Sequence, residues 1–168
     1  IMIEPFTLDL TVLADNIPPG KSVRFEVQLN EAEEYLLCER FNFIKLENVA
    51  GKLALGQIAD RCWELKGQIN ATVTQACVVS GQLVESPIVI ELEERFVHTL
   101  SEQVEIDAME IDVGLLLNGE IPVGESVCQW IGVSAPAWPR AENVPILGES
   151  DPDPIENHPF AKLSELKK

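Results

Sequence analysis

The sequence predicts an α+β domain with a mostly antiparallel sheet. Apolar and polar residues alternate in several segments between residues 22 and 96, as in strands with one buried and one solvated face. Residues 30–42 instead have the spacing of an amphipathic helix. A length of 168 residues fits one domain, and a hydrophobic content of 46% is ordinary for a globular protein.

The strands follow from period-two patterning. A first strand is predicted over residues 6–12 and a second over residues 22–29, separated by a break that contains two prolines and a glycine. Later strand-like segments cover residues 49–58, 62–64, 68–79 and 84–96. Four glycines are interpreted as marks of turns or bulges between or within these strands: Gly51, Gly56, Gly67 and Gly81.

The early helix has a clear start. Asn30 is a good N-cap, and the glutamates that follow it favour the positive end of the helix dipole. Its predicted apolar face consists of Ala32, Leu36 and Phe41, joined by Leu37. A second short helix is predicted near residues 124–133, and a short C-terminal helical motif carries Phe160, Leu163 and Leu166.

Residues 1–140 are interpreted as a single domain. Its body covers residues 1–100, and the acidic segment 101–140 is expected to pack on that body. Residues 141–157 are rich in proline and acid and predict a mobile loop, and residues 158–168 predict a C-terminal docking motif.

The composition is strongly acidic. Twelve Lys and Arg against 28 Asp and Glu give a net charge of −16. Such a surface repels nucleic acid at long range and attracts basic proteins. No apolar stretch is long enough to span a bilayer, and the first residues lack the features of a secretory signal, so we expect a cytoplasmic protein with no membrane contact.

Catalytic and metal-binding patterns are weak. The four cysteines are widely separated, which does not fit a zinc site, and no phosphate-binding or hydrolase motif is present. Cys77 and His98 are a conceivable dyad, and Glu93 and Glu94 face opposite sides of a strand. We therefore expect no enzyme activity and no cofactor or metal. An uncharacterised hydrolase ranks third, after the two binding functions described below.

Partner binding is the better hypothesis. The acidic stretch after residue 100 offers Glu102, Glu105 and Glu110 to a basic partner. Trp138 and Arg140 are of the types enriched at interface hot spots, and Phe160 is the apolar anchor of the C-terminal motif.

Several motifs occur in the order typical of one family. The central one is Val73-Thr74-Gln75-Ala76-Cys77-Val78-Val79-Ser80; a glutamate-rich helix precedes it, and Gly124-Glu125, Trp138-Pro139-Arg140 and Pro159-Phe160-Ala161-Lys162-Leu163 follow it. In these motifs and their order the chain resembles the YceD-like family of bacterial proteins, also called large ribosomal RNA subunit accumulation proteins. The residues that carry the resemblance are Thr74, Gln75, Cys77, Val78, Gly124, Glu125, Pro139, Pro159, Phe160 and Leu163.

This chain departs from the family pattern at two places. Many relatives have Cys-x-x-Cys in the central motif, whereas Ser80 stands in the second position here, which argues against zinc. Pro122 replaces an aspartate that would cap the second helix.

The resemblance implies a non-enzymatic role in large-subunit ribosomal RNA accumulation and in assembly of the large ribosomal subunit. The charge suggests that the acidic surface holds a basic ribosomal protein or an assembly intermediate. The alternative is direct RNA binding through a patch formed by Arg24, Arg40, Lys45, Lys52, Arg61 and Lys66.

Overall fold

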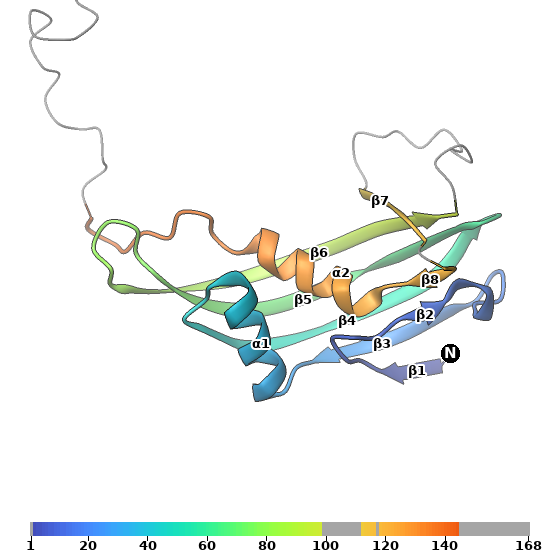
Figure 1. Cartoon of the computed structure of the whole chain (residues 1–168), viewed down its shortest axis with the longest axis horizontal. Helices are drawn as coiled ribbons and strands as arrows, with labels where there is room; N and C mark the ends of the chain where they lie inside the picture. Colours follow the sequence, from blue (N-terminus) through green and yellow to red (C-terminus); the bar gives the residue numbers. More distant parts are fainter. Residues whose placement is uncertain (1, 99–111, 117, 145–168) are drawn as a thin grey trace, which may run out of the picture.

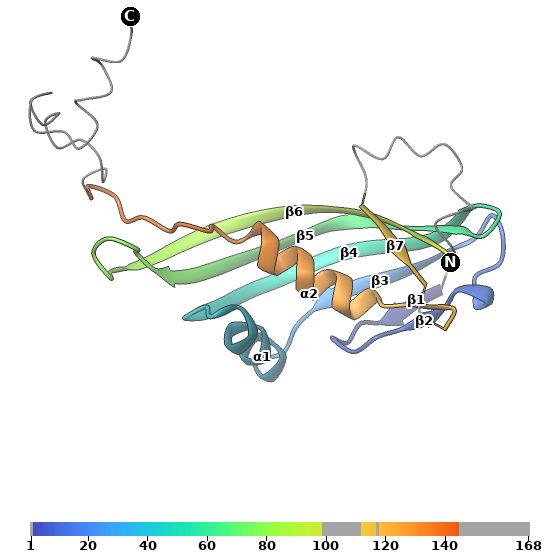
Figure 2. The ribbon, with the colours of Figure 1, turned by 45° about the horizontal axis from the view of Figure 1, so that its top comes forward.

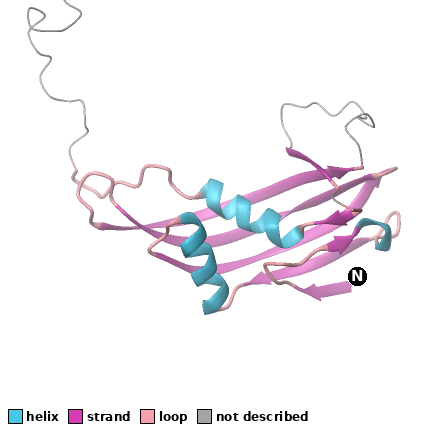
Figure 3. Ribbon diagram, in the orientation of Figure 1, coloured by secondary structure: helices cyan, strands magenta, loops and turns pink. Residues whose placement is uncertain are grey.

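The computed structural model describes residues 2–98, 112–116 and 118–144. A six-stranded sheet has the order β1-β3-β4-β5-β6-β7, and β2 and β8 form a separate two-stranded sheet. The elements are β1 (Met2–Pro5), β2 (Val12–Leu13), a 3-10 turn (Ala14–Asn16), β3 (Ser22–Gln28), α1 (Glu31–Phe41), β4 (Lys45–Ala59), β5 (Cys62–Ala76), β6 (Leu83–Val97), β7 (Asp112–Leu115), β8 (Glu120–Ile121) and α2 (Val123–Ser134). The prediction of an α+β fold with a mostly antiparallel sheet is confirmed (Figure 3).

Three long strands form the centre of the sheet. β4, β5 and β6 have 15 residues each and pair antiparallel as consecutive hairpins. At about 3.3 Å per residue, each spans roughly 50 Å. The two edge pairings, β1 with β3 and β6 with β7, are parallel.

The core lies on one face of this sheet. Both helices cover that face, with α2 running along the strands and α1 lying near the first residues of β4 (Figure 1, Figure 2). The buried strand residues Leu65, Ile69 and Ile90 belong to one apolar cluster with Leu37 of α1 and Ile131 of α2. Burial on one face only explains the alternation of apolar and polar residues along the strands.

Helix α2 is held against the N-terminal segment by a close backbone contact. The backbone N–H of Gly124 donates to the carbonyl of Leu10 at 3.0 Å. A Cβ at this position would lie 2.2 Å from the carbonyl oxygen of Leu8, so only glycine fits. The helix has no side-chain cap at Pro122, because proline has no side-chain acceptor.

Helix α1 begins and ends with defined caps. The Asn30 side chain accepts from the backbone N–H of Glu33, and the Glu33 side chain accepts from the backbone N–H of Asn30, which is a capping box. At the other end Asn42 adopts the left-handed conformation, and Phe43 donates its N–H to the Cys38 carbonyl. This turn directs the buried Phe43 toward the core and leads the chain into β4.

Three details of the sequence prediction are wrong. Residues 6–12 alternate in burial as expected, but they form a turn up to Leu10 because their backbone bonds to itself and to Gly124. The predicted segments 62–64 and 68–79 are one strand, β5, so Gly67 lies inside it and marks no turn. On α1 the buried residue is Leu37, whereas Leu36 is 57% exposed.

Some predictions fall outside the described residues. These are the acidic residues Glu102, Glu105 and Glu110, most of the loop predicted at 141–157, and the C-terminal motif with Pro159, Phe160 and Leu163. Among the residues that the structure does describe, no helix has the length and apolar character needed to cross a membrane.

Candidate functional site

Two motifs that are 60 residues apart in the chain meet at one end of the sheet. The Val78 N–H donates to the Pro139 carbonyl at 2.9 Å, and the Gln75 side-chain amide donates to the Pro136 carbonyl at 3.0 Å. The segment after α2 therefore runs along the connection between β5 and β6 (Figure 2). We call this surface, formed by residues 74–84 and 133–141, the apolar end.

The apolar end carries almost no charge, unlike the acidic chain as a whole. Residues 65–84 and 126–141 contain no Asp or Glu and only one base each, Lys66 and Arg140. Several large apolar side chains are exposed there: Val78, Leu83, Val133 (80% exposed) and Trp138 (79% exposed). Exposed apolar side chains in segments without carboxylates, on an otherwise acidic protein, are typical of a protein interaction site.

The motif residues divide into two groups. Thr74, Cys77 and Pro139 are buried and hold the two segments together, whereas Val78, Trp138 and Arg140 are exposed. Trp138 and Arg140, which the sequence suggested as partner-binding residues, therefore both lie on the surface. They flank Pro139, which accepts a hydrogen bond from the central motif. Whether they contact a partner stays a prediction.

Cys77 lies in a set of hydrogen-bond donors. The backbone N–H groups of Val79 and Ser80 point to its Sγ at 3.5 and 3.4 Å. The Ser80 hydroxyl, together with these N–H groups and that of Ala141, lowers the pKa of the Cys77 thiol to about 6. Burial instead raises the pKa of Cys128, on α2, to about 11.

The structure separates the proposed Cys77–His98 dyad. His98 stacks edge-on against Trp63 near the start of β5, with ring centroids 5.4 Å apart. Cys77 follows the last residue of that strand, roughly 45 Å away at the usual rise per residue. In the described ranges, no group of three His, Cys, Asp or Glu side chains is placed to hold a metal ion.

Gly124 and Glu125 lie away from the apolar end, at the start of α2. The Glu125 carboxylate accepts two hydrogen bonds from the Arg40 guanidinium of α1, at 2.9 and 2.5 Å. This motif therefore links the two helices. Arg40 was expected in the alternative RNA patch, and its pairing with Glu125 was not predicted from the sequence.

Half of the six bases of that patch are already paired with glutamates. Arg40 is paired with Glu125, Lys45 with Glu47, and Lys66 with Glu64. Arg24, Lys52 and Lys66 do share the open face of the sheet, but glutamates stand in the same rows of paired residues, Glu26 opposite Lys52 and Glu93 opposite Lys66. The resulting face has alternating charges and no continuous positive stripe.

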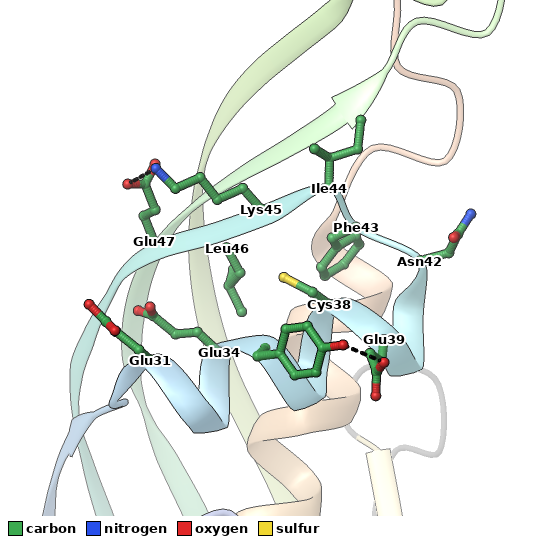
Figure 4. Close-up of a pocket in the computed structure, with 11 residues that line it drawn as sticks. Glu31, Glu34, Cys38, Glu39, Asn42, Phe43, Ile44, Lys45, Leu46 and Glu47 are labelled. Atoms are coloured by element: carbon green, nitrogen blue, oxygen red, sulfur yellow. Dashed lines mark hydrogen bonds and ion pairs between the residues drawn. The ribbon is translucent and has the colours of Figure 1, made fainter.

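A pocket between α1 and the start of β4 was not predicted from sequence (Figure 4). It has a volume of about 570 Å³, and we call it the acidic pocket. Its floor is apolar and includes Cys38, Phe43 and Leu46, and Tyr35 and Ile44 are further lining residues. Four glutamates line it: Glu31, Glu34, Glu39 and Glu47.

The charges of this pocket are only partly compensated. Lys45 pairs with Glu47 at 2.5 Å, and the Tyr35 hydroxyl donates to Glu39 at 2.7 Å. Burial raises the pKa of Glu34, and the nearby carboxylates of Glu47 and Glu31 raise it further. The helix dipole, which explains Glu31 and Glu34 at the sequence level, does not account for four glutamates around an apolar floor.

Comparison of the chain with protein-family models, with curated proteins and with solved structures finds no match. The resemblance to the YceD-like family therefore rests on the motifs alone.

Proposed function

We propose that this protein is a non-enzymatic factor that supports large-subunit ribosomal RNA accumulation and assembly of the large ribosomal subunit by holding a basic ribosomal protein. The observation that carries the proposal is the apolar end, an exposed surface without carboxylates in a chain of net charge −16. The family motifs supply the link to the ribosome.

The two surface properties have different roles in such binding. The acidic body attracts a basic protein over several ångströms and raises the rate of encounter. Buried apolar and aromatic contacts then supply most of the affinity, and Trp138 is well suited to such a contact. The protein would thus keep a basic partner from premature contact with RNA.

Direct RNA binding has less support. Phosphate recognition depends on clustered bases, because the release of counterions supplies much of the affinity. Of the six bases in the alternative patch, Arg40, Lys45 and Lys66 are paired with glutamates, and Lys52 stands opposite Glu26 on the open face of the sheet.

The first experiment is a pull-down from lysate with and without nuclease, followed by identification of the retained proteins. We expect basic large-subunit proteins to stay bound after nuclease treatment. Retention of ribosomal RNA alone, with loss of all ribosomal proteins after nuclease, would support the RNA alternative and refute the proposal.

The second experiment is a titration of a retained, purified protein at increasing salt. Affinity should fall as ionic strength rises, and Trp138→Ala should weaken it about tenfold or more, as expected for a hot spot. Val89→Ala is the matched control, because Val89 is an exposed apolar residue of β6 outside the apolar end. Equal affinities for both variants would remove the apolar end from the binding site.

A further inference from the structure

The acidic pocket has features that point to a particular kind of occupant. Within the described residues, the Glu31 and Glu34 carboxylates have neither a hydrogen bond nor an ion pair with a cationic side chain. They lie at one end of the pocket, near Glu47 and its partner Lys45 (Figure 4). Negative charge at this position is therefore in excess.

The apolar floor indicates that the missing cation is part of a long side chain. Leu46 and Phe43 are buried beneath the pocket, and Cys38 is partly buried beside them. Lysine and arginine place their methylene stems on apolar surface and keep the charged head at its rim, where these carboxylates lie. A small metal ion fits less well, because the described part of the chain groups no three ligand side chains for one.

The pocket adjoins the first residue of the apolar end. Ile44 lines the pocket and is exposed, and its N–H donates to the carbonyl of Thr74, the start of the central motif, at 2.9 Å. A single segment of a partner can therefore contact both surfaces when basic and apolar residues stand close together in it.

We propose that the acidic pocket between α1 and β4 binds a lysine or arginine side chain of a basic partner segment whose neighbouring apolar residues lie on the apolar end. This inference rests on the proposed function, since it names the place where the ribosomal protein would be held. It also assigns Glu31 and Glu34 to partner binding, in addition to any part that the acidic stretch after residue 100 has.

The test compares two variants that remove the same amount of charge. In the variant E31Q/E34Q both pocket carboxylates become amides of the same shape, and the capping glutamate Glu33 is untouched. In the control E91Q/E93Q two exposed glutamates of β6, on the open face of the sheet, are changed in the same way. Both variants should keep the circular dichroism spectrum of the wild type, since all four side chains are at least partly exposed.

Two probes are titrated by fluorescence anisotropy: the purified basic ribosomal protein that the wild type retains, and fluorescein-labelled deca-arginine. We expect E31Q/E34Q to weaken the binding of both probes about tenfold, and the control less than twofold. Equal weakening by the two variants would show that only overall charge matters and would overturn the pocket assignment, while the proposed function would stand. If the wild type retains no ribosomal protein, the proposed function fails, and the deca-arginine titration still decides whether the pocket binds a basic segment.

Discussion

Replacing Gly124 by alanine tests how tightly α2 is joined to the N-terminal segment. The new Cβ would lie 2.2 Å from the Leu8 carbonyl oxygen and 2.8 Å from that of Thr7, closer than real Cβ atoms approach. Because both obstacles belong to the backbone, the segment must move away from the helix. The 3.0 Å hydrogen bond from Gly124 to Leu10 would be weakened by that movement.

The expected cost follows from three contributions. Overpacking costs about 1–3 kcal/mol, and the weakened hydrogen bond costs about 0.5–1.5 kcal/mol. The better helix propensity of alanine offsets about 1 kcal/mol. The net loss in the free energy of unfolding is about 2 kcal/mol, which corresponds to a decrease in Tm of roughly 4–8 °C for a protein of this size.

Urea denaturation followed by circular dichroism measures this loss, and a second glycine of α2 provides the control. A Cβ at Gly132 would meet the Phe41 ring at 2.3 Å, which is a side chain and can be made smaller. We expect Phe41→Leu to relieve part of the cost of Gly132→Ala, and Leu8→Ala to relieve none of the cost of Gly124→Ala. An unchanged free energy of unfolding for Gly124→Ala, or its rescue by Leu8→Ala, would refute the backbone contact as the cause.

Three further predictions concern single interactions. Arg40→Ala should destabilise the protein by only about 0.2–1 kcal/mol, because the side chains of Arg40 and Glu125 are 43% and 42% exposed. Arg40 lowers the pKa of Glu125, so the stabilisation should be fully present above the unfolded-state pKa of that carboxyl. Urea titrations should show it disappear as the pH falls through the lower folded-state pKa. Thiolate absorbance should show Cys77 ionising near pH 6, and the free energy of unfolding should rise between about pH 6 and the unfolded thiol's pKa. Ser80→Ala should move this titration to higher pH, and an unshifted titration in that variant would contradict the role of the Ser80 hydroxyl. If the C-terminal motif docks, burial of the Phe160 ring contributes about 1.5–3 kcal/mol to that docking. Phe160→Ala should then increase hydrogen exchange in the motif, and unchanged exchange and unchanged partner binding would contradict docking.

The sheet could be predicted from the sequence because one-sided burial is visible as alternation. The prediction failed at residues 6–12 for a specific reason. Phe6, Leu8 and Leu10 do face inward more than Thr7 and Asp9, but a strand also requires a neighbouring strand for its backbone. Here the backbone partners are Gly124 and the turn itself, and nothing in the local sequence indicates them.

The candidate site was predicted only in part. Trp138 and the central motif were each identified, but the hydrogen bonds of Pro136 and Pro139 with that motif depend on the path of the chain after α2, which no local pattern specifies. The acidic pocket was missed because Glu31 and Glu34 were explained by the helix dipole and Lys45 was assigned to the RNA patch, while Glu47 was given no role. Only the turn at Asn42 brings these two elements face to face.

The long meander of β4, β5 and β6 has a consequence for synthesis of the protein. These strands are consecutive in the chain, so their pairing requires only short loops and can form once Val97 has emerged from the ribosome. Helix α2, which covers their apolar face, begins only at Val123. During translation these three strands can thus pair before α2 emerges, and the part of their apolar face that α2 covers, with Leu65, Ile69 and Ile90 in the same core, remains open to other nascent chains and to chaperones until Ser134 has emerged.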